Sequence, residues 1–412
     1  MGTIDSDTED LDVVPDDAAL RLLEDYEAGS SFYFSSPRGA VLARGVEAVV
    51  PKVRCGKAGL PQKVAEFLAG ARGFNRPDPM VVGAVPFGEN LPAHLVLPSE
   101  VVRAEPLRTT GESVRSVNAP ECAVQPVPLP EEYERGVQRV LRRIADGEMS
   151  KIVLARSLQL TAQQPIEIQD VLRNLATTDP SGYTFAVDLP RRGEDGIRDP
   201  RGPHPEFART FLGASPELLV SRFGGRVRAN PMAGSRPRST DPVEDQRRAA
   251  ELSTSDKDLR EHAAVVDAVV EQLRPFCSEL DVQPRPSVIS TAAMWHLATE
   301  ITGRLKSTDT TSLELAAALH PTPAVCGTPV DQARKVIAEI EPFDRGYYAG
   351  MVGWCDASGD GEWVVAIRCA EIEDEVLRLF AGAGIVEGSD PASELAETTA
   401  KFRTALSAMG LE

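Results

Sequence analysis

The sequence predicts a mixed α/β protein in which antiparallel sheets are flanked by helices. Strand-like runs follow one another along the chain with helices between only some of them, whereas a parallel sheet needs regular alternation of strand and helix. Neither a G-x-G-x-x-G turn between a strand and a helix nor a phosphate-binding P-loop occurs, so nucleotide cofactors have no support. The 412 residues, of which 42% are hydrophobic, are enough for a large core.

Three stretches have the apolar spacing of helices. In residues 131–148, apolar side chains recur at i, i+4, i+7, i+8 and i+11 and therefore share one helical face: Tyr133, Val137, Val140, Leu141 and Ile144. Gly147 is a suitable C-terminal stop for this helix. Residues 258–273 and 391–408 are the other predicted helices.

Short runs rich in β-branched and aromatic residues predict the strands. The run 151–156 is expected to form a buried strand that begins at Lys151. Residues 109–130 have little periodicity and are interpreted as a crossing segment, and residues 190–205 as a solvent loop rich in Arg, Asp, Gly and Pro. The remaining strands are expected at residues 183–189, 210–214, 218–223, 347–355, 363–369 and 376–381.

The charge of the chain limits its partners. A formal net charge of −18 makes nucleic acid and anionic membranes poor partners, because both need a basic footprint. No run approaches the roughly 20 apolar residues that span a bilayer. The six cysteines form no C-x-x-C pair, so we expect reduced thiols and a cytoplasmic location. Any site for an anionic substrate must reverse the negative sign locally, with a few cations or a metal.

The segment 394–401 is the first candidate for chemistry. Glu394, Glu397 and Lys401 lie at i, i+3 and i+7 on one helical face, and a solvated charged stripe is the common explanation of that spacing alone. The preceding strand ends in Gly382 and Gly384, and we expect a turn there whose backbone N–H groups approach a carboxylate closely. This neighbourhood favours a binding site over the solvated stripe.

Three further acidic or basic positions are candidates, each with a structural alternative. Glu261 follows Asp258 at i+3 near the start of a helix, where capping explains Asp258 but not Glu261, and Mg²⁺ prefers carboxylate ligands. Glu217 ends a small-residue turn, G-A-S-P-E, which is also a common β-turn pattern. Lys151 is either a solvated lysine or a general base, and a base needs a lowered pKa.

These segments together resemble the chorismate-binding enzyme family, which includes isochorismate, salicylate, anthranilate and aminodeoxychorismate synthases. The resemblance runs from about residue 131 to the C-terminus. It rests on eight segments in the family's order: S-K-I-V-L-A-R (150–156), G-A-S-P-E (213–217), P-M-A-G-S-R-P (231–237), K-D-L-R-E-H (257–262), H-P-T-P-A-V-C-G (320–327), Y-Y-A-G (347–350), A-I-R (366–368) and residues 381–401.

The resemblance implies a magnesium-dependent enzyme that acts on chorismate. It implies a Mg²⁺ held mainly by Glu261 and Glu397, with Glu394 as a ligand or a supporting residue. Lys151 is similar to the family's general base and Glu217 to its general acid. The groups that the resemblance assigns to substrate binding are His296, Ala324, Tyr348, Arg368, Gly382, Gly384 and Lys401.

Single residues separate the members of the family. Ala233 stands where aminodeoxychorismate synthases carry a lysine, and Lys151 stands where anthranilate synthases carry a glutamine and use ammonia from a glutaminase subunit. The resemblance therefore implies an isochorismate synthase of the catechol-siderophore type, without a glutaminase subunit, that adds water at C2 and expels the C4 hydroxyl. Ala324 stands where salicylate synthases carry threonine. A salicylate synthase and a non-catalytic chorismate-binding protein remain as alternatives.

The same resemblance implies a single domain made of two packed antiparallel sheets with helices outside. Within the chain we expect a disordered acidic tail over residues 1–17, the N-terminal part of the fold over residues 18–120, and the catalytic region over residues 121–412. We also expect a monomer.

Overall fold

A computed structural model describes residues 18–29, 31–52, 59–73, 78–107, 114, 117, 122–179, 182–190, 209–291 and 294–411. The predicted tail of residues 1–17 lies outside these residues, as does the predicted loop 190–205 apart from Pro190. In the described part of the chain, no helix is long and apolar enough to cross a membrane.

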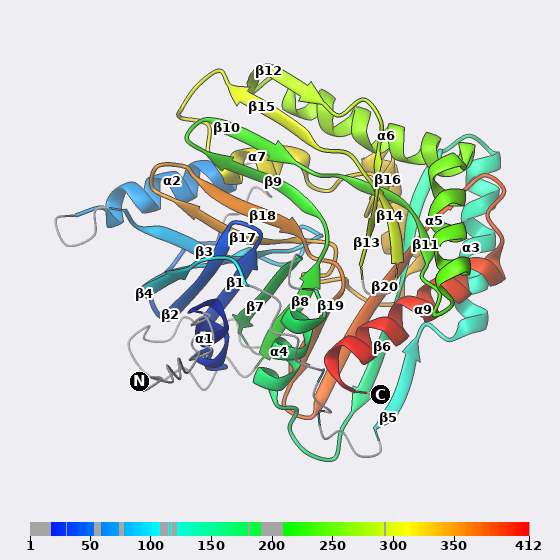
Figure 1. Ribbon diagram of the computed structural model, residues 1–412, viewed down its shortest axis with the longest axis horizontal. Helices are drawn as coiled ribbons and strands as arrows, with labels where there is room; N and C mark the ends of the chain where they lie inside the picture. The colour runs from blue at the N-terminus through cyan, green and yellow to red at the C-terminus, as the bar shows by residue number, and fades with distance from the viewer. Residues whose placement is uncertain are drawn as a thin grey trace, which may run out of the picture.

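The fold class is mixed α/β with antiparallel sheets, as predicted. Seventeen strands of the described residues form one continuous antiparallel ladder, in the order β12-β15-β10-β9-β18-β17-β3-β4-β2-β1-β7-β8-β19-β20-β6-β5, with β16 beside the start of β6 (Figure 1). The strands are β1 (Ser31–Ser36), β2 (Gly39–Val49), β3 (Met80–Val85), β4 (His94–Ala104), β5 (Ala123–Val127), β6 (Lys151–Thr161), β7 (Tyr183–Leu189), β8 (Arg209–Ser215), β9 (Leu218–Phe223), β10 (Arg226–Ala229), β12 (Cys277–Val282), β15 (Ile301–Leu305), β16 (Gly327–Thr328), β17 (Met351–Asp356), β18 (Gly361–Val365), β19 (Cys369–Glu373) and β20 (Val376–Val386).

A second sheet, of three strands, is not paired with any strand of this ladder among the described residues. Its order is β11 (Met232–Pro237), β14 (Met294–Ala298) and β13 (Ser287–Ser290), again antiparallel. It packs against the helices α5 and α6. The helices of the described residues are α1 (Ala18–Glu24), α2 (Leu60–Ala71), α3 (Pro130–Ala145), α4 (Ile168–Thr178), α5 (Pro242–Thr254), α6 (Asp256–Leu273), α7 (Ser312–Leu319), α8 (Val330–Ile340) and α9 (Pro391–Met409).

Alternate residues of the central strands enter two different cores. Phe185 and Phe211, on β7 and β8, lie with ring centroids 5.5 Å apart in the larger core, which also contains Trp363 of β18. Their neighbours Ala186 and Leu212 point the other way, into a second core. Because a strand turns successive side chains to opposite faces, a strand covered on both faces must be apolar throughout. This is why these strands appear in the sequence as continuous apolar runs.

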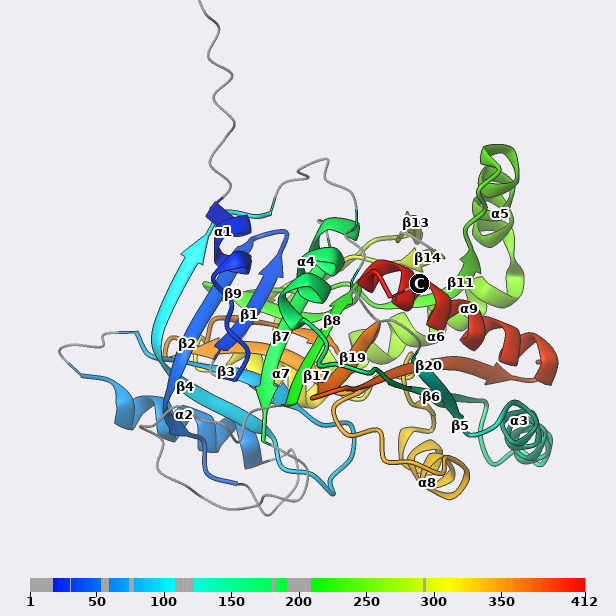
Figure 2. The same cartoon turned by 90° about the horizontal axis from the view of Figure 1, so that it is seen from below.

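The helices follow the predicted pattern. In α3 the predicted face is buried at Tyr133, Val137, Val140 and Ile144. Gly147 adopts a positive φ of 77° just beyond the helix, and its N–H bonds to the carbonyl of Ile144, as expected of a C-terminal stop. Figure 2 shows α3 and α5 at one end of the molecule and α1 and α2 at the other, with α5 projecting outward.

Some predicted elements were wrong in detail. The run 347–355 forms a strand only from Met351, where β17 begins, and the run 376–381 continues as β20 to Val386. The crossing segment contains strand β5, whose residues are mostly exposed and therefore lack an apolar pattern. The run 363–369 is not one strand, because the chain leaves β18 after Val365 and starts β19 at Cys369. Arg368 lies in the break with a φ of 52°, a left-handed conformation that costs a non-glycine residue about 1 kcal/mol.

Strands β1 to β4, from the first part of the chain, belong to the same ladder as the later strands. The division at residue 120 therefore does not coincide with a break in the main sheet. As a boundary of the catalytic region it stays a prediction.

Candidate active site

One cavity gathers the predicted site residues, which lie between positions 151 and 401 of the sequence. Residues of β6 and β20, of the small sheet and of helices α6 and α9 line it; Figure 1 labels these elements. All the predicted residues except Glu394 line it: Lys151, Glu217, Glu261, His296, Ala324, Tyr348, Arg368, Gly382, Gly384, Glu397 and Lys401.

Strand β20 lines one side of the cavity, its floor. The sequence predicted a turn at Gly382 and Gly384, and that prediction was wrong. Gly382 and Gly384 lie inside β20, opposite Ala155 and Val153 of β6. A Cβ atom on Gly382 would come within 2.8 Å of the Tyr348 hydroxyl oxygen. One on Gly384 would come within 3.2 Å of Glu261 Oε1. The glycines therefore open the floor to side chains from other elements, and the strand continues through them because glycine is tolerated where atoms approach closely.

Lys151 and Glu261 meet across the cavity. Lys151 is the first residue of β6, Glu261 lies in the second turn of α6, and Lys151 Nζ donates to Glu261 Oε1 over 2.6 Å. Both side chains are largely buried, with 9% and 16% of their surface exposed. The alternative of a solvated Lys151 is therefore wrong.

Glu217 is a buried carboxyl group in the connection between β8 and β9. Burial raises its pKa to about 8, although the Met232 N–H, Lys151 and Arg368 all act in the opposite direction. Only 3% of the residue is exposed. At neutral pH, Glu217 therefore holds a proton that it can donate.

Arg368 and His296 lie side by side in the cavity. Arg368 Nη2 is 3.5 Å from His296 Nε2. Burial, together with the charges of Arg368 and Lys401, lowers the pKa of His296 well below its usual value. His296 is therefore a neutral imidazole at pH 7, next to a permanent cation.

Helix α9 contributes a second lysine–glutamate pair. Lys401 Nζ donates to Glu397 Oε1 over 2.5 Å and to the Gly382 carbonyl over 2.8 Å, which ties α9 to the floor strand. Burial acts to raise the pKa of Glu397, but Lys401 and Arg368 outweigh it and lower that pKa. Glu394 is buried beside the cavity rather than on its lining, and burial raises its pKa.

The two remaining predicted residues have no charge. The ring of Tyr348 stacks on Phe380 with centroids 5.0 Å apart and an angle of 9° between the rings. Ala324 lies between α7 and β16 and contributes a methyl group to the lining.

The glutamates do not form a ready-made metal cluster. Within the described residues, no group of three or more His, Cys, Asp or Glu side chains converges closely enough to hold a metal ion. The donor chemistry nevertheless fits Mg²⁺, which is usually held by one or two carboxylates together with water and substrate oxygens. Glu261 and Glu397 supply two carboxylates to one cavity.

One wall of the cavity was missed by the sequence reasoning. Residues Met232 to Ser235 of β11 line it, and the strand carries a bulge between Ala233 and Ser235, where Gly234 has a φ of 79°. The run M-A-G-S-R-P has neither an alternating nor a continuous apolar pattern. The only signal in the sequence that could have placed this strand at the site was that residues 231–237 are one of the eight segments shared with the family.

Comparisons with known proteins identify the family of the chain. The sequence model of the family described as "Chorismate binding enzyme" matches residues 100–410. The isochorismate synthase DhbC of Bacillus subtilis (strain 168) is 52% identical over 405 residues, which are 98% of this chain and 99% of that protein. The vibriobactin-specific isochorismate synthase of Vibrio cholerae serotype O1 is 38% identical over 93% of this chain and 92% of its own length.

A solved structure of DhbC from Bacillus anthracis has the same fold. It superposes with a TM-score of 0.87 at 48% sequence identity, covering 96% of this chain and 100% of that one. The match of the family model over most of the chain, the relatives of nearly equal length and the assembled cavity lead to one conclusion: this chain belongs to the chorismate-binding enzyme family.

Proposed function

We propose that the chain is a magnesium-dependent isochorismate synthase, which converts chorismate to isochorismate. The observation that carries the proposal is the joint position of Lys151 and Glu217 in one cavity, the first as a base for water and the second as a protonated acid. The names of the Bacillus subtilis and Vibrio cholerae relatives support the same reaction. The second relative's name also supports a product used for a catechol siderophore.

Glu217 is the proton donor of the reaction. Water adds at C2 of the chorismate ring, the ring double bonds shift, and the C4–O bond breaks. Glu217 gives its proton to the C4 oxygen, which leaves as water. A carboxyl group with a pKa of about 8 is protonated at neutral pH and can act in this way.

Lys151 takes the proton from the attacking water. Its nitrogen donates to Glu261 in the structure. An amine keeps its lone pair while it donates one hydrogen, so Lys151 can accept the proton of the water once it has lost its own extra proton. One molecule of water enters at C2 and one leaves from C4, so the reaction is an isomerisation.

The charges of the cavity favour a dicarboxylate together with a divalent cation. The two lysine–glutamate pairs each cancel and Glu217 is neutral, which leaves Arg368 as the uncompensated charge among the described lining residues. Chorismate carries two carboxylates. Glu261 and Glu397 would hold Mg²⁺, with Glu394 in support, and the bound ion would supply positive charge to a substrate carboxylate.

The other substrate contacts follow from what lines the cavity. Arg368 and Lys401 are suited to the substrate carboxylates, and Tyr348 and His296 supply neutral polar groups beside them. The open floor at Gly382 and Gly384 lets the substrate approach the backbone of β20.

Two alternatives predict different outcomes. A salicylate synthase would hold isochorismate until it loses pyruvate, and Ala324 offers the product neither a wedge nor a hydrogen bond for that purpose. A non-catalytic binding protein has no use for a buried, protonated Glu217. The expectations of a monomer, of no glutaminase subunit and of a cytoplasmic location remain predictions.

Product analysis tests the proposal. Purified protein with chorismate and Mg²⁺ near pH 7 should give a reversible mixture of chorismate and isochorismate, and an added isochorismatase should pull the mixture forward. Pyruvate, measured with lactate dehydrogenase, should stay at background. Stoichiometric pyruvate and salicylate would establish the salicylate synthase instead, and unchanged chorismate would establish the binding protein.

A further inference from the structure

The small sheet forms one wall of the cavity. Among the described strands it pairs with none of the main ladder, and short chain segments, residues 229–232 and 298–301, join it to β10 and β15. Strands β11, β14 and β13 pair only with one another among the described strands. This wall nevertheless supplies His296, and the Met232 N–H that faces the carboxyl group of Glu217. Something other than sheet pairing has to hold it in place.

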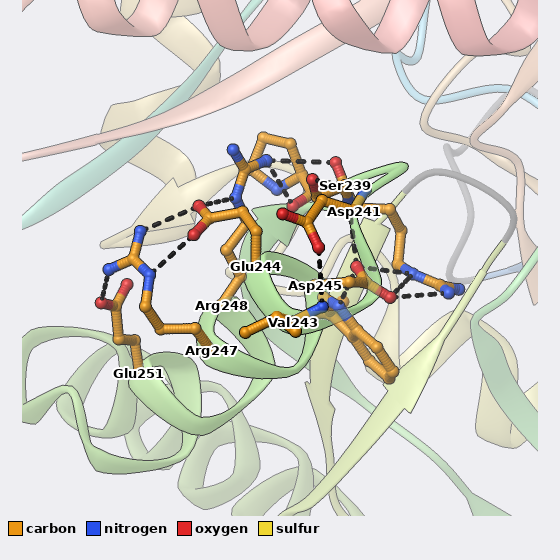
Figure 3. Close-up of polar contacts among 11 residues, drawn as sticks. Ser239, Asp241, Val243, Glu244, Asp245, Arg247, Arg248 and Glu251 are labelled. Atoms are coloured by element: carbon orange, nitrogen blue, oxygen red, sulfur yellow. Dashed lines mark hydrogen bonds and ion pairs between the residues drawn. The ribbon is translucent and has the colours of Figure 1, made fainter.

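A buried carboxylate, that of Asp245, bonds both to the chain just after β11 and to β14. Asp245, in the first turn of α5, accepts hydrogen bonds from Arg238 Nε at 2.9 and 3.0 Å, from the Ser239 N–H at 2.9 Å and from Trp295 Nε1 at 2.9 Å. Figure 3 shows Asp245 at the centre of these contacts. Arg238 also donates to the carbonyl of Thr291, beyond the end of β13.

The same contacts reach both strands that line the cavity. Trp295 lies on the outward face of β14, and its neighbour His296 points the other way, into the cavity. The guanidinium of Arg238 covers the Trp295 ring at 4.5 Å from its centroid. Arg238 follows directly on the last residue of β11, Pro237, so a shift at Arg238 moves the strand that carries Met232.

We propose that Asp245 is a positioning residue for catalysis, which holds the β11–β14 wall so that Met232 and His296 keep their places in the cavity. The inference rests on the proposed function. Asp245 touches none of the reacting groups. It acts through Arg238 and Trp295, and a displacement of about 1 Å at a catalytic group can cost about 100-fold in rate.

The structure supplies a matched control on the same helix, Glu251. Glu251 is exposed and pairs with Arg247 (Figure 3). Glu244 is unsuitable, because its partner Arg248 also donates to the carbonyls of Pro237 and Arg238 and so contacts the wall. Hydrogen bonds from Arg238 lower the pKa of Asp245 to about 2, so Asp245 itself does not titrate between pH 5 and 9. The groups facing Glu217 that influence its titration are the Met232 N–H, Lys151 and Arg368.

The test compares Asp245→Asn with Glu251→Gln in the full chain with chorismate and Mg²⁺. Asp245→Asn should lower kcat/KM by about 10- to 100-fold and move the alkaline limb of its pH profile upward by about half a unit, because the Met232 N–H no longer favours the Glu217 carboxylate. Hydrogen exchange in residues 232–237 and 294–298 should speed up without substrate. Glu251→Gln should match the wild type in all three measurements.

The inference is overturned if Asp245→Asn keeps the wild-type kcat/KM, or loses activity equally at every pH with an unmoved limb. If Asp245→Asn does not fold, Trp295→Phe decides by the same criteria, since it keeps an aromatic ring there and removes the Nε1–H donor to Asp245. A wild-type protein that forms no isochorismate would refute the proposed function, and the exchange measurement would still test the wall.

Discussion

Lys151 Nζ and Glu261 Oε1 lie 2.6 Å apart and join the first residue of β6 to helix α6 across the cavity. The contact pairs the proposed base with a proposed metal ligand, and Lys401 and Glu397 repeat the arrangement on α9. Each cavity lysine thus neutralises a carboxylate that a metal would need. A cation that binds these glutamates therefore competes with two ammonium groups.

The first prediction concerns this competition. Activity should require Mg²⁺ and disappear with a chelator, and Glu261→Gln should weaken both metal and substrate binding because one ligand charge is lost. The chain should stay folded, since Glu261 is at the edge of a cavity rather than in the core. Calorimetric titration of Mg²⁺ measures the effect, with Glu271→Gln on the exposed side of α6 as the control. Full activity of the metal-free wild type would rule the metal out.

The second prediction separates chemistry from binding. Lys151→Ala and Glu217→Gln should each lower kcat by about 10²- to 10⁴-fold and change KM much less, because proton transfers stabilise the transition state rather than the bound substrate. Steady-state kinetics on the purified variants gives both constants. Lys335→Ala, an exposed lysine of α8, should leave both unchanged. If either site variant kept a near-normal kcat, its proton-transfer role would have to be reassigned.

The third prediction concerns pH. Burial raises the pKa of Glu217 to about 8, and the acid works only when protonated, so kcat/KM should fall as the pH rises through about 8. A pH profile from 6 to 9.5 at saturating Mg²⁺ measures this limb. In Glu217→Gln the small remaining activity should lose the limb. A wild-type limb that persists in the variant would belong to another group.

The local sequence pattern predicted individual helices and strands better than it predicted which of them contact one another. The period of the helix at α3 and its stop at Gly147 depend on neighbouring residues, and both were visible in the sequence. The Lys151–Glu261 contact spans 110 positions and depends on ladder register and helix placement, which no local pattern encodes. Only the family resemblance indicated that Lys151 and Glu261 belong to one site.

The sequence pattern missed two kinds of feature: an unusual backbone conformation, at Arg368, and a cavity wall made of small and polar residues, in β11. The left-handed turn at Arg368 interrupts a run of strand-forming residues because the main chain bends there, not because the composition changes. Strand β11 is short and rich in small and polar residues, and its neighbours in the cavity come from β14 and α6. Its role becomes visible only when Met232 is found beside Glu217.

The last prediction concerns a buried carboxyl group outside the cavity. Glu362, on β18, is 4% exposed and accepts a hydrogen bond from the Ser36 hydroxyl over 3.0 Å. Burial raises its pKa from 4.5 to about 7, although Ser36 and three arginines (Arg38, Arg103 and Arg228) oppose the change. Between these two pH values the folded chain binds a proton that the unfolded chain has lost. The stability from this group is therefore fully present below pH 4.5 and is lost as the pH rises through about 7.

Glu362→Gln should remove that dependence, because an uncharged amide can still accept the Ser36 hydrogen bond. The variant should gain stability over the wild type as the pH rises from 5 to 8, by an amount on the order of 3 kcal/mol. Denaturant unfolding at both pH values measures the difference, and Glu271→Gln controls for the loss of a surface charge. Comparing each variant with the wild type at the same pH cancels the titration of other buried acids, such as Asp188, whose pKa burial raises to about 6. An equal offset between Glu362→Gln and the wild type at pH 5 and pH 8 would mean that Glu362 stays ionised throughout, with the three arginines outweighing its burial.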